Sequence, residues 1–105
     1  MKYATQADFD AVVLDTPGIT VADFYADWCG PCRMLAPVLE EVDAAAEGKF
    51  QVVKVNTDEN RDLAVKYNVM TIPSLIYFVN GVEAFRSAGF TSKQAILTKV
   101  DELKN

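Results

Sequence analysis

The amino-acid sequence predicts an α/β fold, in which a mixed β-sheet carries helices on both of its faces. Apolar runs of strand length alternate with amphipathic segments of helix length, an order that favours parallel strands joined through helices. Near the C-terminal end, Asn80-Gly81 separates two strand-like runs, and this dipeptide is typical of a hairpin. The chain has 105 residues, of which 50% are hydrophobic, enough for one core. We therefore expect residues 1–105 to form a single three-layer domain.

The first elements lead into an apolar run at residues 19–25. Residues 2–4 favour a short strand, and Thr5 followed by Asp8 resembles a capping box that begins a helix. Thr16-Pro17-Gly18 is a turn signal that ends this helix. The run at 19–25 is almost continuous in apolar residues, as expected for a central strand covered on both faces. The helix before it should bury Phe9, Val12 and Val13.

A long amphipathic helix follows and begins at Pro31. Proline suits a first turn, because the N–H groups there have no helical partner. Pro37 removes a helical hydrogen bond, but the apolar stripe continues across it, so the helix is expected to continue as well. Gly48 is the expected C-cap. The core-facing stripe consists of Cys32, Leu35, Leu39, Val42 and Ala46.

The second half begins with a strand at residues 50–56 and a short helix capped by Asp58 or Asn60. This helix carries Leu63 and Tyr67 on its apolar side.

The hairpin strands then span residues 75–79 and 82–87, and Gly89 ends the second strand. Thr91 and Gln94 form a second capping box at the start of the last helix. The residues that this helix should bury are Ile96, Leu97, Val100 and Leu103.

Both cysteines lie in Trp28-Cys29-Gly30-Pro31-Cys32, between the central strand and the long helix. Two cysteines at this spacing and in this position indicate redox chemistry. Unpaired N–H groups and the positive helix end should favour a thiolate at Cys29, which we expect to be the more exposed sulfur. Cys32 faces the core and should keep its proton longer. One sulfur then acts as nucleophile and the other as resolving thiol, while Gly30 is expected to permit a tight turn.

Asp23 interrupts the apolar central strand and is the candidate group for proton transfer. If the carboxyl is buried, desolvation raises its pKa and lets it exchange a proton with a nearby thiol, for example Cys32 through a bridging water. The alternative is a surface carboxylate on a partly exposed strand, or a buried polar group whose hydrogen bonds are satisfied. Lys54 lies in the middle of the next strand, either as an ion partner of Asp23 or with its ammonium group in water.

Other residues near the dithiol allow more than one interpretation. Trp28 is either a packing residue or a flat apolar surface for a peptide substrate. Pro73, which precedes a strand, is by default a trans proline. A single pair of cysteines is also half a zinc site, but the chain has no histidine and no further cysteine, so we expect no metal unless two molecules share one. The aromatic residues assigned to the core are Phe24, Tyr25, Phe50, Tyr77 and Phe78.

Composition restricts the partners and the compartment. The formal charge is −5 and there is no long basic run, which argues against nucleic acid or an anionic membrane surface. Residues 1–8 lack the apolar core of a signal peptide, and the uncharged run at 67–82 is too short and too interrupted to span a bilayer. We expect a soluble protein in a reducing compartment, the cytoplasm.

Taken together, these residues resemble the thioredoxin family over essentially the whole chain. The sequence Trp28-Cys29-Gly30-Pro31-Cys32 matches the active-site motif of the family without change. The resemblance implies a five-stranded sheet with four helices and a reversible Cys29–Cys32 disulfide, in which Cys29 attacks a target disulfide and Cys32 resolves the mixed disulfide. It also implies a buried Asp23 near Lys54, and a cis Ile72–Pro73 bond that faces the sulfurs and replaces the trans default.

The same resemblance implies the activity and its partners. Family members are protein-disulfide reductases that need no cofactor of their own and act as monomers. They bind disulfide-containing target proteins, such as reductases and peroxidases, along Trp28, Thr71-Ile72-Pro73 and Ala88-Gly89-Phe90. A thioredoxin reductase, either NADPH–flavin or ferredoxin-linked, recycles them. Departures from the usual family pattern at Tyr25, Thr71, Ser74 and Phe90 bear on target preference and leave the dithiol unchanged.

Two other functions compete with this interpretation. The first is a disulfide oxidant or isomerase on the same fold, which Gly30-Pro31 and the lack of a signal peptide oppose. The second is a binding subunit that uses the surface around Trp28 and Pro73 whatever the redox state of the cysteines.

Overall fold

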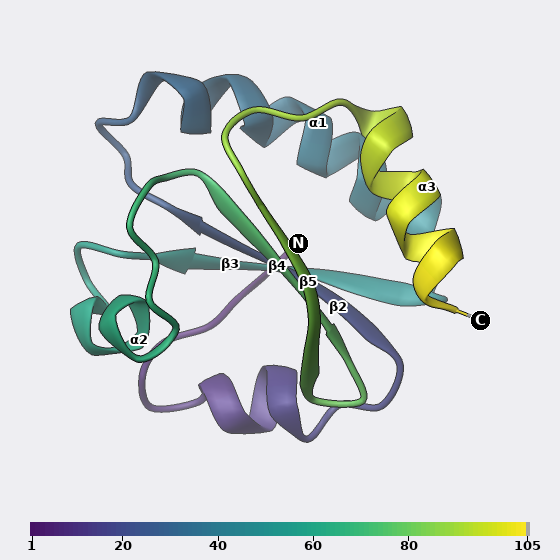
Figure 1. Ribbon diagram of the computed structural model, residues 1–105, viewed down its shortest axis with the longest axis horizontal. Helices are drawn as coiled ribbons and strands as arrows, with labels where there is room; N and C mark the ends of the chain where they lie inside the picture. The colour runs from purple at the N-terminus through teal and green to yellow at the C-terminus, as the bar shows by residue number, and fades with distance from the viewer. Residues whose placement is uncertain (105) are drawn as a thin grey trace.

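The structure is a computed structural model that describes residues 1–104, which form a five-stranded mixed sheet and four helices (Figure 1). The strand order is β1-β3-β2-β4-β5; β1, β2 and β3 are parallel, β4 is antiparallel to β2, and β5 is antiparallel to β4. The strands are β1 (Lys2–Tyr3), β2 (Ile19–Tyr25), β3 (Phe50–Asn56), β4 (Ser74–Val79) and β5 (Val82–Ala88). The helices are η1 (Asp10–Leu14), α1 (Gly30–Ala46), α2 (Arg61–Lys66) and α3 (Lys93–Leu103). The predicted order of elements is therefore confirmed.

The sheet divides the core into two halves. Helices α1 and α3 cover one face, and η1 and α2 lie on the other side (Figure 1). Because side chains alternate along a strand, β2 sends Val21 toward α1 and α3, and sends Ala22 and Phe24 toward η1 and α2. All of β2 up to Phe24 is buried, as its continuous apolar sequence predicts for a central strand.

Helix α1 begins at Gly30, one residue before the predicted Pro31, and it buries the predicted stripe, Cys32, Leu35, Leu39, Val42 and Ala46. Pro37 lies inside the helix, again as expected. The C-cap is the one difference. Glu47 takes the left-handed conformation with φ 50°, and Gly48 follows with φ 77°, so the prediction of Gly48 as C-cap is wrong by one residue. The helix ends through two successive residues with positive φ.

The first helix, η1, is a π-helix of five residues and is shorter than its sequence suggests. The N–H of Asp15 donates to the carbonyl O of Asp10 at 2.8 Å, a bond that spans five residues. The N–H of Thr5 donates to Asp8 Oδ1 at 2.7 Å, which is half of the predicted capping box. Of the three residues expected to be buried, Phe9 and Val13 are buried and Val12 is half-buried.

The caps of the last two helices correct two predictions. Asn60 is at the N-cap of α2, but the N–H of Asp62 is capped by Gln6 Oε1 from the N-terminal segment, at 2.9 Å. In α3 the N-cap is Ser92 rather than Thr91: Ser92 Oγ accepts the N–H of Ala95 at 3.1 Å. Gln94 instead donates to Thr98 Oγ1, so no Thr91–Gln94 capping box forms. Of the core residues predicted for α3, Ile96 and Val100 are buried, and Leu97 and Leu103 are half-buried.

The hairpin turn at Asn80-Gly81 is confirmed. Both residues have positive φ, 51° and 81°, as a two-residue type I′ turn requires. Asn80 also fastens the turn to the loop before β2, because the N–H of Gly18 donates to Asn80 Oδ1 at 2.7 Å. Only glycine fits at position 81, since a Cβ there would collide with the carbonyl of Leu14.

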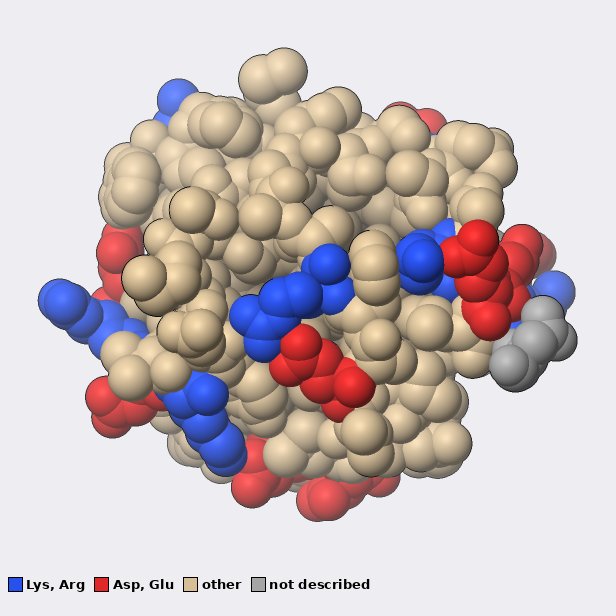
Figure 2. Space-filling model, in the orientation of Figure 1, with Lys and Arg blue, Asp and Glu red and all other residues tan. Residues whose placement is uncertain are grey.

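The charged side chains on the face that carries β5 are interspersed rather than gathered by sign (Figure 2). Arg86 pairs with Glu83 at 2.7 Å, and Lys99 pairs with Glu102 at 2.8 Å. No helix within residues 1–104 has the length and apolar character needed to cross a membrane.

Candidate active site

Cys29 and Cys32 are joined by a disulfide at the start of α1, with their Cα atoms 5.2 Å apart. Cys29 is the N-cap of the helix, in an extended conformation, and its Sγ accepts the N–H of Cys32 at 3.1 Å. A sulfur in this position faces the unpaired N–H groups and the positive end of the helix dipole.

The prediction that Cys29 is the more exposed sulfur is wrong for this disulfide form. Both cysteines are only 4% exposed. Ile72, which lies 43 residues further along the chain, packs against them with Tyr25, and its carbonyl O is 3.8 Å from Cys29 Sγ. This cover comes from another part of the fold, so the local sequence around Cys29 did not indicate it.

The expectation that Gly30 is needed for a tight turn is also wrong. Gly30 does not have a positive φ, and a Cβ at this position would meet open space. The turn into α1 therefore does not need glycine, and Pro31 follows in the first turn as predicted.

The end of β2, the start of β4 and the end of β5 meet at the edge of the sheet that carries the dithiol. Because β4 runs antiparallel to β2, the start of β4 lies beside the end of β2, where Ser74 is opposite Phe24. The Ile72–Pro73 bond before β4 is cis, as the family resemblance implied and against the trans default. The N–H of Gly89 donates to the carbonyl O of Pro73 at 2.7 Å, which joins the end of β5 to the same edge.

Asp23 is a buried carboxyl, 1% exposed, and the alternative of a surface carboxylate is wrong. Its Oδ1 has no hydrogen-bond partner among residues 1–104. Burial raises the pKa of Asp23 to about 7, and the positive charge of Lys54 opposes this rise only in part. A carboxyl with such a pKa can gain or lose a proton near neutral pH.

Lys54 is opposite Asp23 in the register of β2 and β3 and is 8% exposed, so its ammonium group is not simply in water. Lys54 Nζ lies 4.4 Å from the centre of the Tyr25 ring, a cation–π contact. No ion pair within 4 Å joins Lys54 to Asp23 in the described part of the chain. Asp23 and Lys54 have the same strand parity as Val21 and Val52, so both point toward the face that α1 covers.

A cavity of about 210 Å³ opens beside the dithiol. Cys32, Arg33 and Ala36 line it from α1, and Tyr25 and Lys54 line it from the ends of β2 and β3. It is large enough for several water molecules and brings solvent to Cys32 and Lys54.

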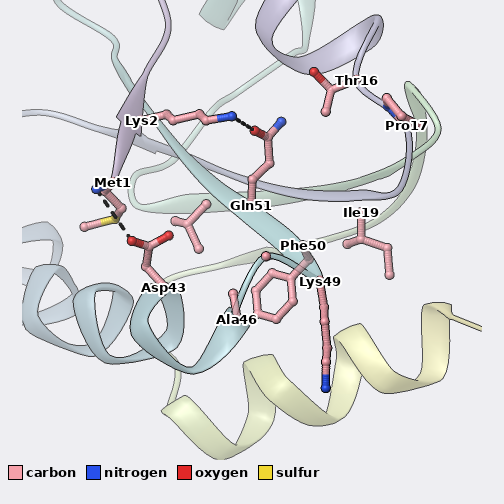
Figure 3. A pocket seen from close by; sticks show the side chains of 12 residues that line it. Met1, Lys2, Thr16, Pro17, Ile19, Asp43, Ala46, Lys49, Phe50 and Gln51 are labelled. Atoms are coloured by element: carbon pink, nitrogen blue, oxygen red, sulfur yellow. Dashed lines mark hydrogen bonds and ion pairs between the residues drawn. The ribbon is translucent and has the colours of Figure 1, made fainter.

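A larger cavity, of about 500 Å³, lies at the opposite end of β2 and β3 (Figure 3). Its walls include Ile19 and Phe50, and two pairs of its polar groups are engaged with one another. Lys2 Nζ donates to Gln51 Oε1 at 2.8 Å, and the amino group of Met1 is 3.5 Å from Asp43. This cavity contains none of the residues that carry the redox chemistry.

The residues predicted to bind targets surround the dithiol. Trp28 is 68% exposed and Phe90 is 51% exposed; Thr71 is exposed, while Ile72 and Gly89 are half-buried. Of the aromatic residues assigned to the core, Phe24, Tyr77 and Phe78 are buried, whereas Tyr25 and Phe50 are half-buried.

The sequence interpretation missed the role of Asp58 beside Trp28. The indole Nε1–H of Trp28 donates to Asp58 Oδ2 at 2.8 Å. The side chain of Asn56 holds the loop, since Asn56 Oδ1 accepts the N–H groups of Asp58 and Glu59. The sequence predicts Asp58 only as a helix cap, and the available signal is its position two residues after β3, the strand next to β2.

The site consists of a reversible pair of cysteines at a helix N-terminus, a buried carboxyl and an apolar exposed rim. A fold and site of this kind define a thiol–disulfide oxidoreductase. The family model for thioredoxin matches residues 1–102, and the chain belongs to the thioredoxin family. Thioredoxins from Staphylococcus aureus strains Mu50 / ATCC 700699 and MW2 are each 46% identical to it over 98 residues, which is 93% of this chain and 92% of theirs. The function of the chain is therefore reversible dithiol–disulfide exchange through Cys29 and Cys32, as a protein-disulfide reductase.

Proposed function

We propose that the two cysteines have distinct roles, with Cys29 as the nucleophile and Cys32 as the resolving thiol. The observation that carries this proposal is the Cys32 N–H···Cys29 Sγ bond of 3.1 Å at the N-terminus of α1, which stabilises negative charge on Cys29. Cys32 lies on the core side of the same helix and is not at its N-cap, so its sulfur does not accept the N–H groups of the first turn in the same way.

The exchange then takes place in two balanced steps. Cys29 thiolate attacks one sulfur of a target disulfide, forms a mixed disulfide and releases the other target sulfur as a thiolate, which takes up a proton. Cys32 loses its proton and attacks Cys29 Sγ, which expels the second target thiolate. The target gains two electrons, and the Cys29–Cys32 disulfide forms.

Asp23 is the proposed acceptor of the Cys32 proton, through water in the cavity that Cys32 lines. Its pKa of about 7 suits proton exchange near neutral pH. Lys54 is the proposed charge partner that keeps the ionised form of Asp23 accessible, because its charge opposes the desolvation. Gly30 and Pro31 connect the two cysteines within the first turn of α1, and Pro73 lies next to Ile72, which covers the sulfurs.

The proposed target surface consists of the exposed and half-exposed residues around the dithiol, Trp28, Thr71, Ile72, Gly89 and Phe90. The proposed partners are disulfide-containing proteins, such as reductases and peroxidases, and a thioredoxin reductase that returns the disulfide to the dithiol. We also propose that residues 1–105 act as one domain and as a monomer in the cytoplasm, without a cofactor of their own.

Trapping of targets tests the assigned roles. In Cys32→Ser the mixed disulfide cannot be resolved, so targets should stay covalently attached to Cys29 and appear as reducible adducts on a gel. Cys29→Ser should trap none. If Cys32→Ser gives no adducts while Cys29 still reacts with a thiol reagent, the roles are assigned wrongly. If the Cys29→Ser, Cys32→Ser double variant keeps full biological activity, a redox-independent binding function replaces the proposal.

A further inference from the structure

The edge of the sheet that carries the dithiol has two sides of different chemistry. The strand order β3-β2-β4-β5 places the end of β3, the end of β2, the start of β4 and the end of β5 next to one another along this edge, about 5 Å apart per strand. Cys29 follows β2, so it lies between the loop after β3 on one side and the segments that flank β4 and β5 on the other.

The loop after β3 carries two acidic residues before Arg61 begins α2. Asp58 and Glu59 are both exposed in the loop after β3, and the side chain of Asn56 fixes their backbone. Asp58 is held next to the indole of Trp28 by the 2.8 Å bond, so its charge has a defined position beside the residue that precedes Cys29. The guanidinium of Arg33 lies on α1, where it donates to the carbonyl O of Asp27 at 3.0 Å and does not pair with Asp58.

The side toward β4 and β5 carries two exposed large hydrophobic residues, Met70 four residues before β4 and Phe90 two residues after β5. Met70 is 83% exposed, the highest exposed fraction among the large hydrophobic residues, and Phe90 is 51% exposed. Phe90 follows Gly89, whose N–H is bonded to Pro73, so it belongs to the same edge.

Met70 is exposed in a segment that is anchored at both ends. Before it, the N–H of Val69 donates to the carbonyl O of Ala64 at 2.8 Å, and Val69 packs against the core. After it, Ser74 Oγ donates to the carbonyl O of Thr71 at 2.6 Å, and Ile72 packs on the cysteines. Met70 is therefore an exposed apolar side chain two residues before Ile72, which packs on the cysteines, and it offers contact area to a segment that approaches them.

We infer that this chain prefers target disulfides whose cysteine has an apolar residue on one flank, which contacts Met70, and a basic residue on the other, which faces Asp58 and Glu59. The inference rests on the proposed function and adds the class of target segment to it. Each flank supplies a separate contribution, one of apolar burial and one of charge complementarity. The two contributions can therefore be removed one at a time.

Three peptide disulfides of equal length test the inference. Each is a symmetric dimer joined through one cysteine: the first has leucine and lysine as flanks, the second has serine in place of leucine, and the third has glutamate in place of lysine. Each peptide is made twice, with the two flanking residues before and after the cysteine exchanged, and the version that is reduced faster is used for the comparison. The protein is reduced with dithiothreitol and freed of it, and the second-order rate of one turnover is followed by chromatography of the peptide thiols. One turnover converts one peptide disulfide into two thiols and leaves the Cys29–Cys32 disulfide.

The native protein should reduce the leucine–lysine peptide roughly fivefold faster than either of the others. Met70→Gln should bring the leucine-to-serine ratio below about twofold and leave the lysine-to-glutamate ratio unchanged. Asp58→Asn should lower the lysine-to-glutamate ratio and leave the leucine-to-serine ratio unchanged. The amide oxygen of the variant still accepts the indole N–H of Trp28, but the negative charge is gone. Val65→Gln is the matched control, because Val65 is 78% exposed on α2, and it should alter neither ratio.

Equal rates for the three peptides would overturn the inference while the reductase function stands. A loss of selectivity in Val65→Gln as large as that in Met70→Gln would also overturn it, because the effect would then not belong to this edge. If the native protein reduces none of the peptides, the proposed reductase function fails together with the inference.

Discussion

The residue with the largest electrostatic consequence is Asp23. A group whose pKa is raised on folding binds its proton more tightly in the folded state than in the unfolded state. The stability that this provides is complete below the unfolded pKa of 3.8 and is lost as the pH rises through the folded value of about 7. Ionised Asp23 therefore destabilises the folded protein in neutral and alkaline solution, so this carboxyl does not contribute to folding stability at neutral pH.

Asp23→Asn should remove this pH dependence, because an amide does not ionise. Between about pH 4 and pH 8 the native protein should lose on the order of 2–4 kcal/mol more unfolding free energy than the variant. Urea denaturation of both proteins in the disulfide form at the two pH values measures the difference. Parallel pH dependence in the two proteins would show that Asp23 is not desolvated as the structure describes.

The same substitution should slow the chemistry. Without the proposed proton acceptor for Cys32, the resolving step depends on water alone, so turnover of a disulfide substrate by Asp23→Asn should fall by about tenfold or more near pH 7. The deficit should shrink at higher pH, where Cys32 ionises without help. Asp15→Asn, which removes an exposed carboxylate after η1, is the matched control. Overlapping pH–rate curves for native protein and Asp23→Asn would exclude the proton-transfer role.

At the scale of elements, local sequence patterns predict a helix or strand correctly where its structure depends only on residues within that element. The spacing of Leu35, Leu39 and Val42 predicted the buried face of α1, and the apolar run at 19–25 predicted the central strand. Asn80-Gly81 predicted the hairpin because both residues tolerate positive φ. In each case the cause lies within a few residues of the effect.

The features that were predicted wrongly depend on distant or competing partners. Cys29 is covered by Ile72, 43 residues away, and the N-terminus of α2 is capped by Gln6, 56 residues before Asp62. No local pattern carries that information. The N-cap of α3 was predicted wrongly for another reason. Thr91 and Ser92 both carry a hydroxyl, and a shift of one residue changes which hydroxyl accepts a helix N–H.

The corrected cap of α3 leads to a prediction about stability. Ser92→Ala removes the acceptor of the Ala95 N–H and should lower the free energy of unfolding by about 1 kcal/mol. Thr91→Ala leaves that bond in place and should change it by only a few tenths of a kcal/mol. Thermal or urea unfolding of the two variants compares them. A larger loss in Thr91→Ala than in Ser92→Ala would return the cap to Thr91.

At the scale of the whole molecule, the sheet brings the parts of the site together. The ends of β2, β3 and β5 and the start of β4 reach one edge, although 63 positions separate Tyr25 at the end of β2 from Ala88 at the end of β5. The same order of strands gives the edge its acidic side and its apolar side. The dithiol supplies the chemistry, and the strand order decides which groups surround it.

The central claim is that Cys29 and Cys32 form a reducing pair, and their redox equilibrium with glutathione tests it most directly. The native protein is equilibrated in buffers of known glutathione ratio, and the fraction with a Cys29–Cys32 disulfide is measured by alkylation and mass spectrometry. We predict a potential near about −270 mV, the general value for thioredoxins. A potential between about −180 and −120 mV, the range of isomerases and oxidants, would contradict the account and assign the protein to disulfide formation.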